Sequence, residues 1–266
     1  MTAPQTGYVY RLGDVKIIGV GGVGGIVARY ASLFLASHGA DGRLVLIDGD
    51  AFEPGNASRM LFGSHGNKAE VVRGEILERL GDSELVIEAI DSYVTPETIE
   101  TLIRDGDTVL LCVDNHATRK LVSDFCMRRR RNVSVISGGN DGVGPDSSGI
   151  ELHGTAGNCQ VYLRCDGRDV TPSLAAFHPE IERPADRRPD DVPCTELAAS
   201  VPQIVFANLT AAASMLNAFW ALACGRLRYV EVAFDIEAGR MQPIPLPLPS
   251  PAGQASGTEV TRAGSR

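Results

Sequence analysis

One segment near the amino terminus restricts the possible folds more than any other: an apolar run, a glycine-rich loop and a helical stretch follow one another directly. Val15 to Val20 (VKIIGV) has the composition of a buried strand. Residues 19–25 read GVGGVGG, and residues 23–37 have helical spacing. Glycines let a backbone approach a phosphate, and the free N–H groups of a helix start favour anions. The unit therefore predicts an α/β fold with an anion-binding loop.

The same alternation continues through the first 140 residues. Further strands are expected at residues 44–48, 85–90, 108–113 and 133–137, and further helices at 68–80, 96–103 and 117–130. Strands that alternate with helices predict a Rossmann-like, mostly parallel sheet with helices on both faces.

The second half has a different pattern, although residues 1–245 are expected to form a single domain. In order, we expect a strand at 160–164, a long mobile crossover rich in Pro, Asp and Arg at 166–193, an apolar helix at 196–223, strands at 229–235 and 241–244, and a disordered tail at 246–266. The helix is too apolar for a solvated surface, so we expect it to be buried or to lie at a dimer interface.

Charge and composition exclude several classes of protein. The formal net charge of −8 disfavours nucleic acid as the main partner, because a polyanion is repelled by an acidic surface. No run approaches the roughly 20 consecutive apolar residues of a membrane span, so no membrane association is expected. The amino terminus lacks the basic and apolar regions of a secretory signal, and the cytoplasm is therefore the expected location.

The glycine loop alone leaves two kinds of nucleotide enzyme open. It satisfies G-x-G-x-x-G, with Gly21, Gly22 and Gly24 as candidate nucleotide-binding residues. Asp48, at the end of the second expected strand, is placed to bind ribose hydroxyls. Both a dinucleotide-binding dehydrogenase and an ATP-using enzyme fit this pattern.

Residues further along the chain separate the two readings. They are the D-x-D of Asp48 and Asp50, the N-x-x-R of Asn56 and Arg59, Lys68 at the start of a helix, and the D-N-x-x-x-R of Asp114, Asn115 and Arg119. With the glycine loop, these motifs resemble the E1-like (ThiF/MoeB/HesA-type) family that activates ubiquitin-like and sulfur-carrier proteins. The resemblance is specific over residues 10 to 140 and looser beyond. One family position differs, since Met60 replaces the usual glutamine.

The resemblance implies ATP-dependent adenylation of a C-terminal carboxylate. Such a carboxylate must attack the α-phosphate of ATP and release pyrophosphate, a step that requires fixed cations and a metal ion. By the family match, Asp48 would hold the ribose, Asn56 would orient the α-phosphate, Arg59 and Lys68 would contact the phosphates, Asp114 would hold Mg²⁺, and Asp50 and Asn115 would lie at the nucleotide. The alternative is ordinary: the aspartates could cap helices, and the two cations could be solvated.

Cys194 is the candidate nucleophile, and it lies in the segment VPCTEL before the expected apolar helix. A helix amino terminus lowers a thiol pKa. The segment resembles the Cys-Thr of ubiquitin-type E1 enzymes, which implies a thioester on Cys194 and transfer to an E2-like partner. The alternative is a small buried residue. Cys112, Cys126 and Cys224 are expected in the core, whereas Cys159 and Cys165 flank a strand and are further candidate thiols.

The absence of any C-x-x-C pair excludes the two-pair zinc site of many sulfur-carrier activators, so no zinc is expected. The chain most resembles the compact E1 proteins of bacterial ubiquitin-like conjugation operons. The implied partner is a ubiquitin-like or sulfur-carrier protein ending in glycine, with homodimerisation through the apolar helix. Two alternatives remain: a sulfur-carrier or small-molecule adenylating enzyme without a thioester, and a nonenzymatic scaffold with a degenerate nucleotide site.

Overall fold

The computed structural model describes residues 12–38, 42–58, 60–145, 149–191 and 203–246. The strands are β1 (Val15–Ile18), β2 (Leu44–Ile47), β3 (Ala51–Phe52), β4 (Gly66–Asn67), β5 (Ile87–Ile90), β6 (Thr108–Leu111), β7 (Val133–Asn140), β8 (Val143–Pro145), β9 (Glu151–His153), β10 (Ala156–Cys165), β11 (Arg168–Asp169), β12 (Tyr229–Asp235) and β13 (Arg240–Pro245). The helices are α1 (Gly24–His38), η1 (Pro54–Ser58), α2 (Lys68–Leu80), α3 (Ile99–Leu102), α4 (His116–Arg129), α5 (Pro179–Glu182), η2 (Pro189–Asp191) and α6 (Val205–Ala223).

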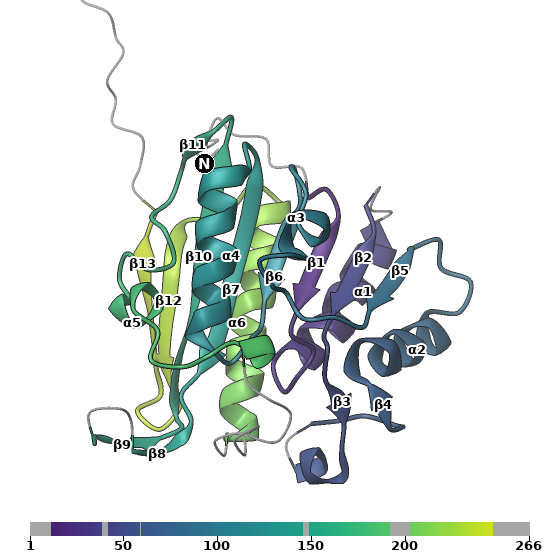
Figure 1. The fold of residues 1–266 in the computed structure, drawn as a ribbon, viewed down its shortest axis with the longest axis horizontal. Coiled ribbons are helices and arrows are strands. Elements are labelled where there is room, and N and C mark those ends of the chain that lie inside the picture. The colour runs from purple at the N-terminus through teal and green to yellow at the C-terminus, as the bar shows by residue number, and fades with distance from the viewer. Residues whose placement is uncertain (1–11, 39–41, 59, 146–148, 192–202, 247–266) are drawn as a thin grey trace, which may run out of the picture.

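A mixed sheet forms the centre of the molecule, with strand order β13-β12-β10-β7-β6-β1-β2-β5 and β11 paired to β10 (Figure 1). Strands β5, β2, β1, β6 and β7 run parallel, whereas β10, β12 and β13 pair antiparallel. The predicted Rossmann-like, mostly parallel sheet is confirmed. The chain leaves β1 first toward β2 and later returns to the other side of β1 through β6, so a topological switch point lies between β1 and β6.

Alternate residues of the central strands build two separate cores, one on each face of the sheet. Ile17 of β1 packs with α1, α2 and α6, whereas its neighbour Ile18 packs with α3 and α4. Leu46 and Ile47 of β2 divide in the same way. Because both faces are covered, β2 is apolar throughout and β1 is apolar except for Lys16, which is close to the pattern of buried parallel strands.

Helix boundaries agree with the predictions in the first half, with one exception. Helix α2 spans residues 68–80 as predicted, whereas α3 covers only Ile99–Leu102 of the predicted 96–103. The residues before α3 form a turn in which the hydroxyl of Thr98 accepts the N–H of Thr95 at 2.9 Å, so the regular helix begins late. In the second half, β10 extends well beyond the predicted 160–164 because it pairs with β7 on one side and β12 on the other.

The apolar helix α6 begins at Val205, and the predicted start at Glu196 is wrong, since residues 203 and 204 are not helical. By length and composition it is the one helix among the described residues that could cross a membrane. It packs instead against β7, β10 and α1, and 56% of its most apolar 18-residue window is buried, as in a core helix. The prediction that this helix is buried is confirmed for its inner face.

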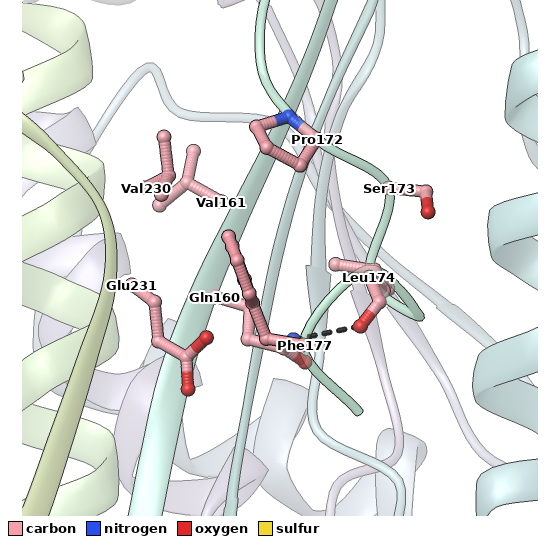
Figure 2. A pocket seen from close by; sticks show the side chains of 8 residues that line it. All are labelled: Gln160, Val161, Pro172, Ser173, Leu174, Phe177, Val230 and Glu231. Carbon is pink, nitrogen blue, oxygen red and sulfur yellow. Dashed lines mark hydrogen bonds between the residues drawn. The ribbon is translucent and has the colours of Figure 1, made fainter. Parts of the chain in front are cut away.

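The crossover predicted at 166–193 contains β11, α5 and η2 within its described part, residues 166–191. Two apolar side chains anchor it, since Leu174 and Ile181 are each 2% exposed and belong to the core that also holds α3 and α4. Gln160 of β10 adds a hydrogen bond from Nε2 to the carbonyl of Leu174 at 2.8 Å (Figure 2). This segment therefore lies against the sheet and brings its polar residues to the start of α4. Residues 192, 193 and the predicted tail beyond 246 lie outside the described residues.

Candidate nucleotide site at the carboxyl ends of the parallel strands

The predicted site residues come from the loops that follow three neighbouring strands. The glycine loop follows β1, Asp48 follows β2, and Asp114 follows β6. These three strands lie side by side and parallel, so their carboxyl ends share one edge of the sheet. Ligands of open α/β sheets bind outside this edge, at the switch point of the strand order.

The glycine loop is a tight turn that two of its glycines make possible. Gly19 has a φ of +83°, a left-handed conformation that residues with a Cβ rarely adopt. A Cβ on Gly24 would lie 1.8 Å from the carbonyl oxygen of Gly19, so the start of α1 and the end of β1 touch through bare backbone. Gly21 differs, because the nearest atom to its Cβ position is a methyl of Met60 at 3.6 Å. Gly21 has space for a side chain, so packing within the protein does not require glycine at this position.

Asp48 fixes this loop through backbone hydrogen bonds. One carboxylate oxygen accepts the N–H of Val20 at 2.5 Å, and the other accepts the N–H of Asp50 at 2.8 Å. The side chain is buried, and burial raises the pKa of Asp48 despite the nearby charge of Lys68. Each oxygen retains a lone pair, so the carboxylate joins β1 and β2 and still has capacity to accept from ribose hydroxyls.

Lys68 and Asp50 form a partly buried ion pair beside this loop. The Lys68 ammonium donates to Asp50 Oδ2 at 2.9 Å, and the hydroxyl of Tyr93 donates to the other oxygen. Burial acts to raise the pKa of Asp50, but the charge of Lys68 and these two hydrogen bonds outweigh it and hold that pKa below its usual value. Lys68 is thus held in place by a carboxylate, and Tyr93 is a residue of this network that the sequence did not indicate.

Asn56 and Arg59 follow on the segment between β3 and β4. Asn56 lies on η1, and its side-chain oxygen accepts the N–H of Glu53 at 3.0 Å, which closes a local turn. Arg59 lies outside the described residues, so its predicted phosphate contact stays a prediction. The chain just after it is held by Arg29 of α1, which donates to the carbonyl of Leu61 at 2.8 Å.

Arg29 is a second residue that the sequence motifs did not reveal. Its guanidinium also donates to the carbonyl of Gly25 at 2.7 Å and pairs with Glu75 of α2. It therefore joins the first turn of α1, the segment after Arg59 and helix α2. No motif spacing indicates such a contact, because its partners lie 4, 32 and 46 residues away.

The start of α4 holds the two remaining motif residues. Asn115 is the N-cap and accepts the N–H of Thr118 at 2.8 Å, whereas Asp114 precedes it and is exposed to solvent. Asp186 of the crossover reaches the same helix end, where its two oxygens accept the N–H groups of His116 and Ala117 at 2.7 and 2.9 Å. Asp186 thus neutralises the positive end of α4, a contact that no local motif indicated.

Arg119 of α4 is 6% exposed and holds the end of β6 against β7. It donates to the hydroxyl of Ser137 at 2.8 Å and to the carbonyls of Val113 and Gly138 at 2.8 and 3.1 Å. Burial lowers the pKa of Arg119, and no carboxylate among the described residues forms an ion pair with it. Through Val113, this guanidinium positions the backbone that carries Asp114.

Cys194 lies outside the described residues. Its predicted roles, a lowered thiol pKa and nucleophilic attack, therefore stay predictions. The core assignment of Cys112 and Cys126 is confirmed, and burial raises the pKa of each thiol to about 12. Two further assignments change: Cys159 is fully buried, which removes it as a candidate thiol, and Cys224 is exposed.

A preformed metal site is not found in the described part of the chain, and the cavity under the crossover is small. No group of three or more His, Cys, Asp and Glu side chains is arranged to hold a metal ion there. The cavity lined by Gln160, Leu174, Phe177 and Glu231 has a volume of about 10 Å³, which is the size of one water molecule (Figure 2). It lies under the crossover and is too small for a nucleotide.

Comparisons with known proteins agree with this geometry. The curated relatives include the vegetative HesA protein of Trichormus variabilis, 31% identical over 170 residues that make up 62% of this chain and 55% of the relative. The adenylyltransferase and sulfurtransferase uba4 of Neosartorya fischeri is 34% identical over 128 residues, which are 47% of this chain and 24% of the relative. The chain spans about half or less of the length of these relatives.

Among solved structures, E. coli MccB crystallised with ATP superimposes with a TM-score of 0.61 at 18% identity. The match covers 89% of this chain and 64% of that one, and it shows a shared fold. The profile of the ThiF family matches residues 10–230, which include every strand from β1 to β10 and all of the predicted site residues. With the glycine loop, Asp48, Lys68 and Asp114 gathered at one edge of this fold, the chain belongs to the ThiF family.

Proposed function

We propose that this chain is an ATP-dependent adenylating enzyme that activates the C-terminal carboxylate of a small ubiquitin-like or sulfur-carrier protein. The observation that carries the proposal is the convergence of the glycine loop, Asp48 and Lys68 at the carboxyl ends of β1 and β2, beside the switch point of the sheet. Membership of the ThiF family supports it. Further support comes from two relatives, since uba4 is named an adenylyltransferase and MccB was solved with ATP.

The proposed chemistry assigns a task to each group. The carboxylate of the carrier attacks the α-phosphate of ATP, a mixed anhydride forms, and pyrophosphate leaves. The backbone N–H groups of Gly21 and Gly22 hold a phosphate at the start of α1, and Asp48 accepts from the ribose. Lys68 and Arg59 supply the positive charge that the departing pyrophosphate needs.

Asp114 fits the metal that the reaction requires. Mg²⁺ in nucleotide sites is held by one or two carboxylates together with substrate phosphates. Asp114 offers one exposed carboxylate at the carboxyl end of β6, beside the strand that leads into the glycine loop. In this proposal Asp114 would hold Mg²⁺, which would supply positive charge for the pyrophosphate, and Asn115 caps α4 beside it.

Pyrophosphate exchange into ATP tests this proposal, with candidate glycine-terminated carriers and Mg²⁺. Wild type should show carrier-dependent exchange, and Asp114→Ala should lose at least 100-fold of it. Asp82→Ala is the matched control, because Asp82 is an exposed aspartate in the loop after α2. Exchange that survives in Asp114→Ala would remove Asp114 as the metal-holding residue, whereas exchange absent from wild type with every carrier that binds would refute the proposed activity. Carrier binding without exchange would favour a nonenzymatic scaffold.

The fate of the adenylate is a second, finer part of the proposal. We propose that Cys194 attacks the carbonyl carbon of the acyl adenylate, so that a thioester forms, AMP leaves and the carrier passes to an E2-like partner. A carrier adduct that an added thiol or hydroxylamine cleaves, and that Cys194→Ala lacks while Cys224→Ala retains it, is the expected result. Continued AMP release without any adduct would instead favour a sulfur-carrier or small-molecule adenylating enzyme, and the sulfurtransferase in the name of uba4 keeps that alternative open.

We also propose that the chain is a homodimer through α6. The outer face of this helix exposes large apolar side chains at helical spacing, since Phe206, Leu209 and Trp220 are 67%, 44% and 46% exposed. Such a contiguous apolar stripe is typical of a protein–protein interface. Sedimentation should show a dimer for wild type and a monomer for the double substitution Phe206→Lys with Trp220→Lys. A wild-type monomer at micromolar concentration would contradict the proposal.

A further inference from the structure

Asn208, in the first turn of α6, is a buried polar side chain that has no evident role in stabilising the fold. Its exposure is 0%, and neither its Nδ2 nor its Oδ1 has a hydrogen-bond partner among the described residues. The other fully covered residues of the same helix face are small or apolar, as at Ala211 and Met215. Ser214 is the one other buried polar residue of α6, and its hydroxyl donates to the carbonyl of Thr210 at 2.9 Å.

A buried amide without partners destabilises a protein, because its lost hydrogen bonds to water are not replaced. An apolar residue of the same shape at position 208 would avoid this cost. Polar groups left unsatisfied in this way point to a ligand, a water molecule or a functional strain. The surroundings of Asn208 decide between these possibilities.

The amide of Asn208 faces the glycine loop. A Cβ on Gly22 would lie 2.5 Å from Asn208 Nδ2 and 3.7 Å from Gln203 Oε1, so these side chains of the α6 start cover the loop at Gly22. Gly22 lies two residues before Gly24, the first residue of α1, and the N–H groups at a helix start attract an anion. Asn208 thus brings a hydrogen-bond donor from the far end of the chain to Gly22, in the loop that the proposed function assigns to a phosphate.

We propose that Asn208 is a nucleotide-binding residue, whose Nδ2 donates a hydrogen bond to the α-phosphate held on the glycine loop. The inference rests on the proposed nucleotide site and adds a residue to it. The amide group suits this task, since it offers donors to an anion without the positive charge that would be costly at a fully buried position. The ligand then satisfies a group that the protein alone leaves unpaired.

The test compares AMP with adenosine, which differ only in the phosphate. Wild type should bind AMP more tightly than adenosine, and calorimetry gives the ratio of the two dissociation constants. Asn208→Leu, which keeps the shape and removes both polar atoms, should weaken AMP binding about 10-fold or more and leave adenosine within about twofold. Asn208→Asp keeps the acceptor and adds a negative charge, so it should weaken AMP binding further.

Asn217→Leu is the matched control, because Asn217 is an exposed asparagine on the same helix. The ratio of the dissociation constants of AMP and adenosine should be the same for Asn217→Leu as for wild type. The melting temperature separates binding from packing: Asn208→Leu should melt at or above wild type, since it removes an unpaired buried amide. Should the leucine variant fail to fold, Asn208→Ser carries the same comparison.

Two results would overturn the inference, and they are distinguishable. If Asn208→Leu keeps the wild-type ratio of AMP to adenosine affinity, Asn208 does not contact the phosphate, and the proposed nucleotide site stands without it. If wild type itself binds neither AMP nor ATP, the proposed function fails and the assignment of Asn208 fails with it.

Discussion

The contact between the start of α1 and the end of β1 makes a sharp prediction for Gly24→Ala. The new Cβ would lie 1.8 Å from the carbonyl oxygen of Gly19 and 3.0 Å from Cys112 Cβ. A carbon normally stays about 3.3 Å from a carbonyl oxygen, so the loop and the helix must separate by about 1.5 Å. Overpacking of this kind costs about 1–3 kcal/mol, and the upper end applies because both atoms belong to rigid backbone.

The neighbouring residue supplies the matched control. The Cβ position of Gly25 is 3.0 Å from the end of the flexible Arg29 side chain and 3.7 Å from the carbonyl oxygen of Val20, so Gly25→Ala needs only a small side-chain shift. Alanine also favours a helix over glycine by up to about 1 kcal/mol. The two variants should therefore differ by about 3 kcal/mol in the free energy of unfolding.

Thermal and urea unfolding measure this difference. About 3 kcal/mol corresponds to a gap of about 6–12 °C in melting temperature for a chain of this size. Nucleotide affinity should fall about 100-fold in Gly24→Ala, since the loop that holds the phosphate is displaced by more than 1 Å, and stay close to wild type in Gly25→Ala. Equal melting temperatures for the two variants would show that this contact does not shape the loop.

Three further predictions concern the same region and the crossover. Gly21→Ala should leave the melting temperature unchanged, because its Cβ meets only a side-chain methyl at 3.6 Å, yet weaken ATP binding in calorimetry at least 10-fold; unchanged affinity would place the phosphate elsewhere. Lys68→Met should remain folded by circular dichroism and lose at least 100-fold in pyrophosphate exchange, and retention of exchange would reduce Lys68 to a partner of Asp50. His178 donates a hydrogen bond to Glu231 at 2.8 Å, and this bond raises the pKa of His178 in the folded protein. The stability that protonated His178 contributes is therefore complete below the unfolded pKa of about 6.5. That stability is lost as pH rises through the higher pKa of the folded protein. Melting curves from pH 5.5 to 8.5 should therefore show wild type losing stability relative to His178→Gln, and parallel curves would contradict this linkage.

Some residues of the candidate site could be predicted from nearby sequence, and others could not. Lys68 lies at the start of α2 as predicted, because a helix start is signalled by residues a few positions apart. The capping residue of α4 is Asn115, whereas the sequence offered the neighbouring Asp114. Asp186 and Asn208 were not found, since each meets its loop only through tertiary packing, across 69 residues or more. The start of α6 illustrates the opposite failure: apolar spacing extended the predicted helix back to Glu196, although α6 begins at Val205.

Periodicity and glycine spacing determined the fold class, because buried parallel strands, helix faces and phosphate-binding loops each leave a short-range pattern in the sequence. Tertiary structure alone decided which of these elements meet. The pairing of β10 with both β7 and β12 set the true length of that strand. The crossover carried Asp186 to α4, and the packing of α6 carried Asn208 to Gly22. The physical reason is that burial and hydrogen bonding between distant segments depend on the path of the whole chain, which no window of neighbouring residues contains.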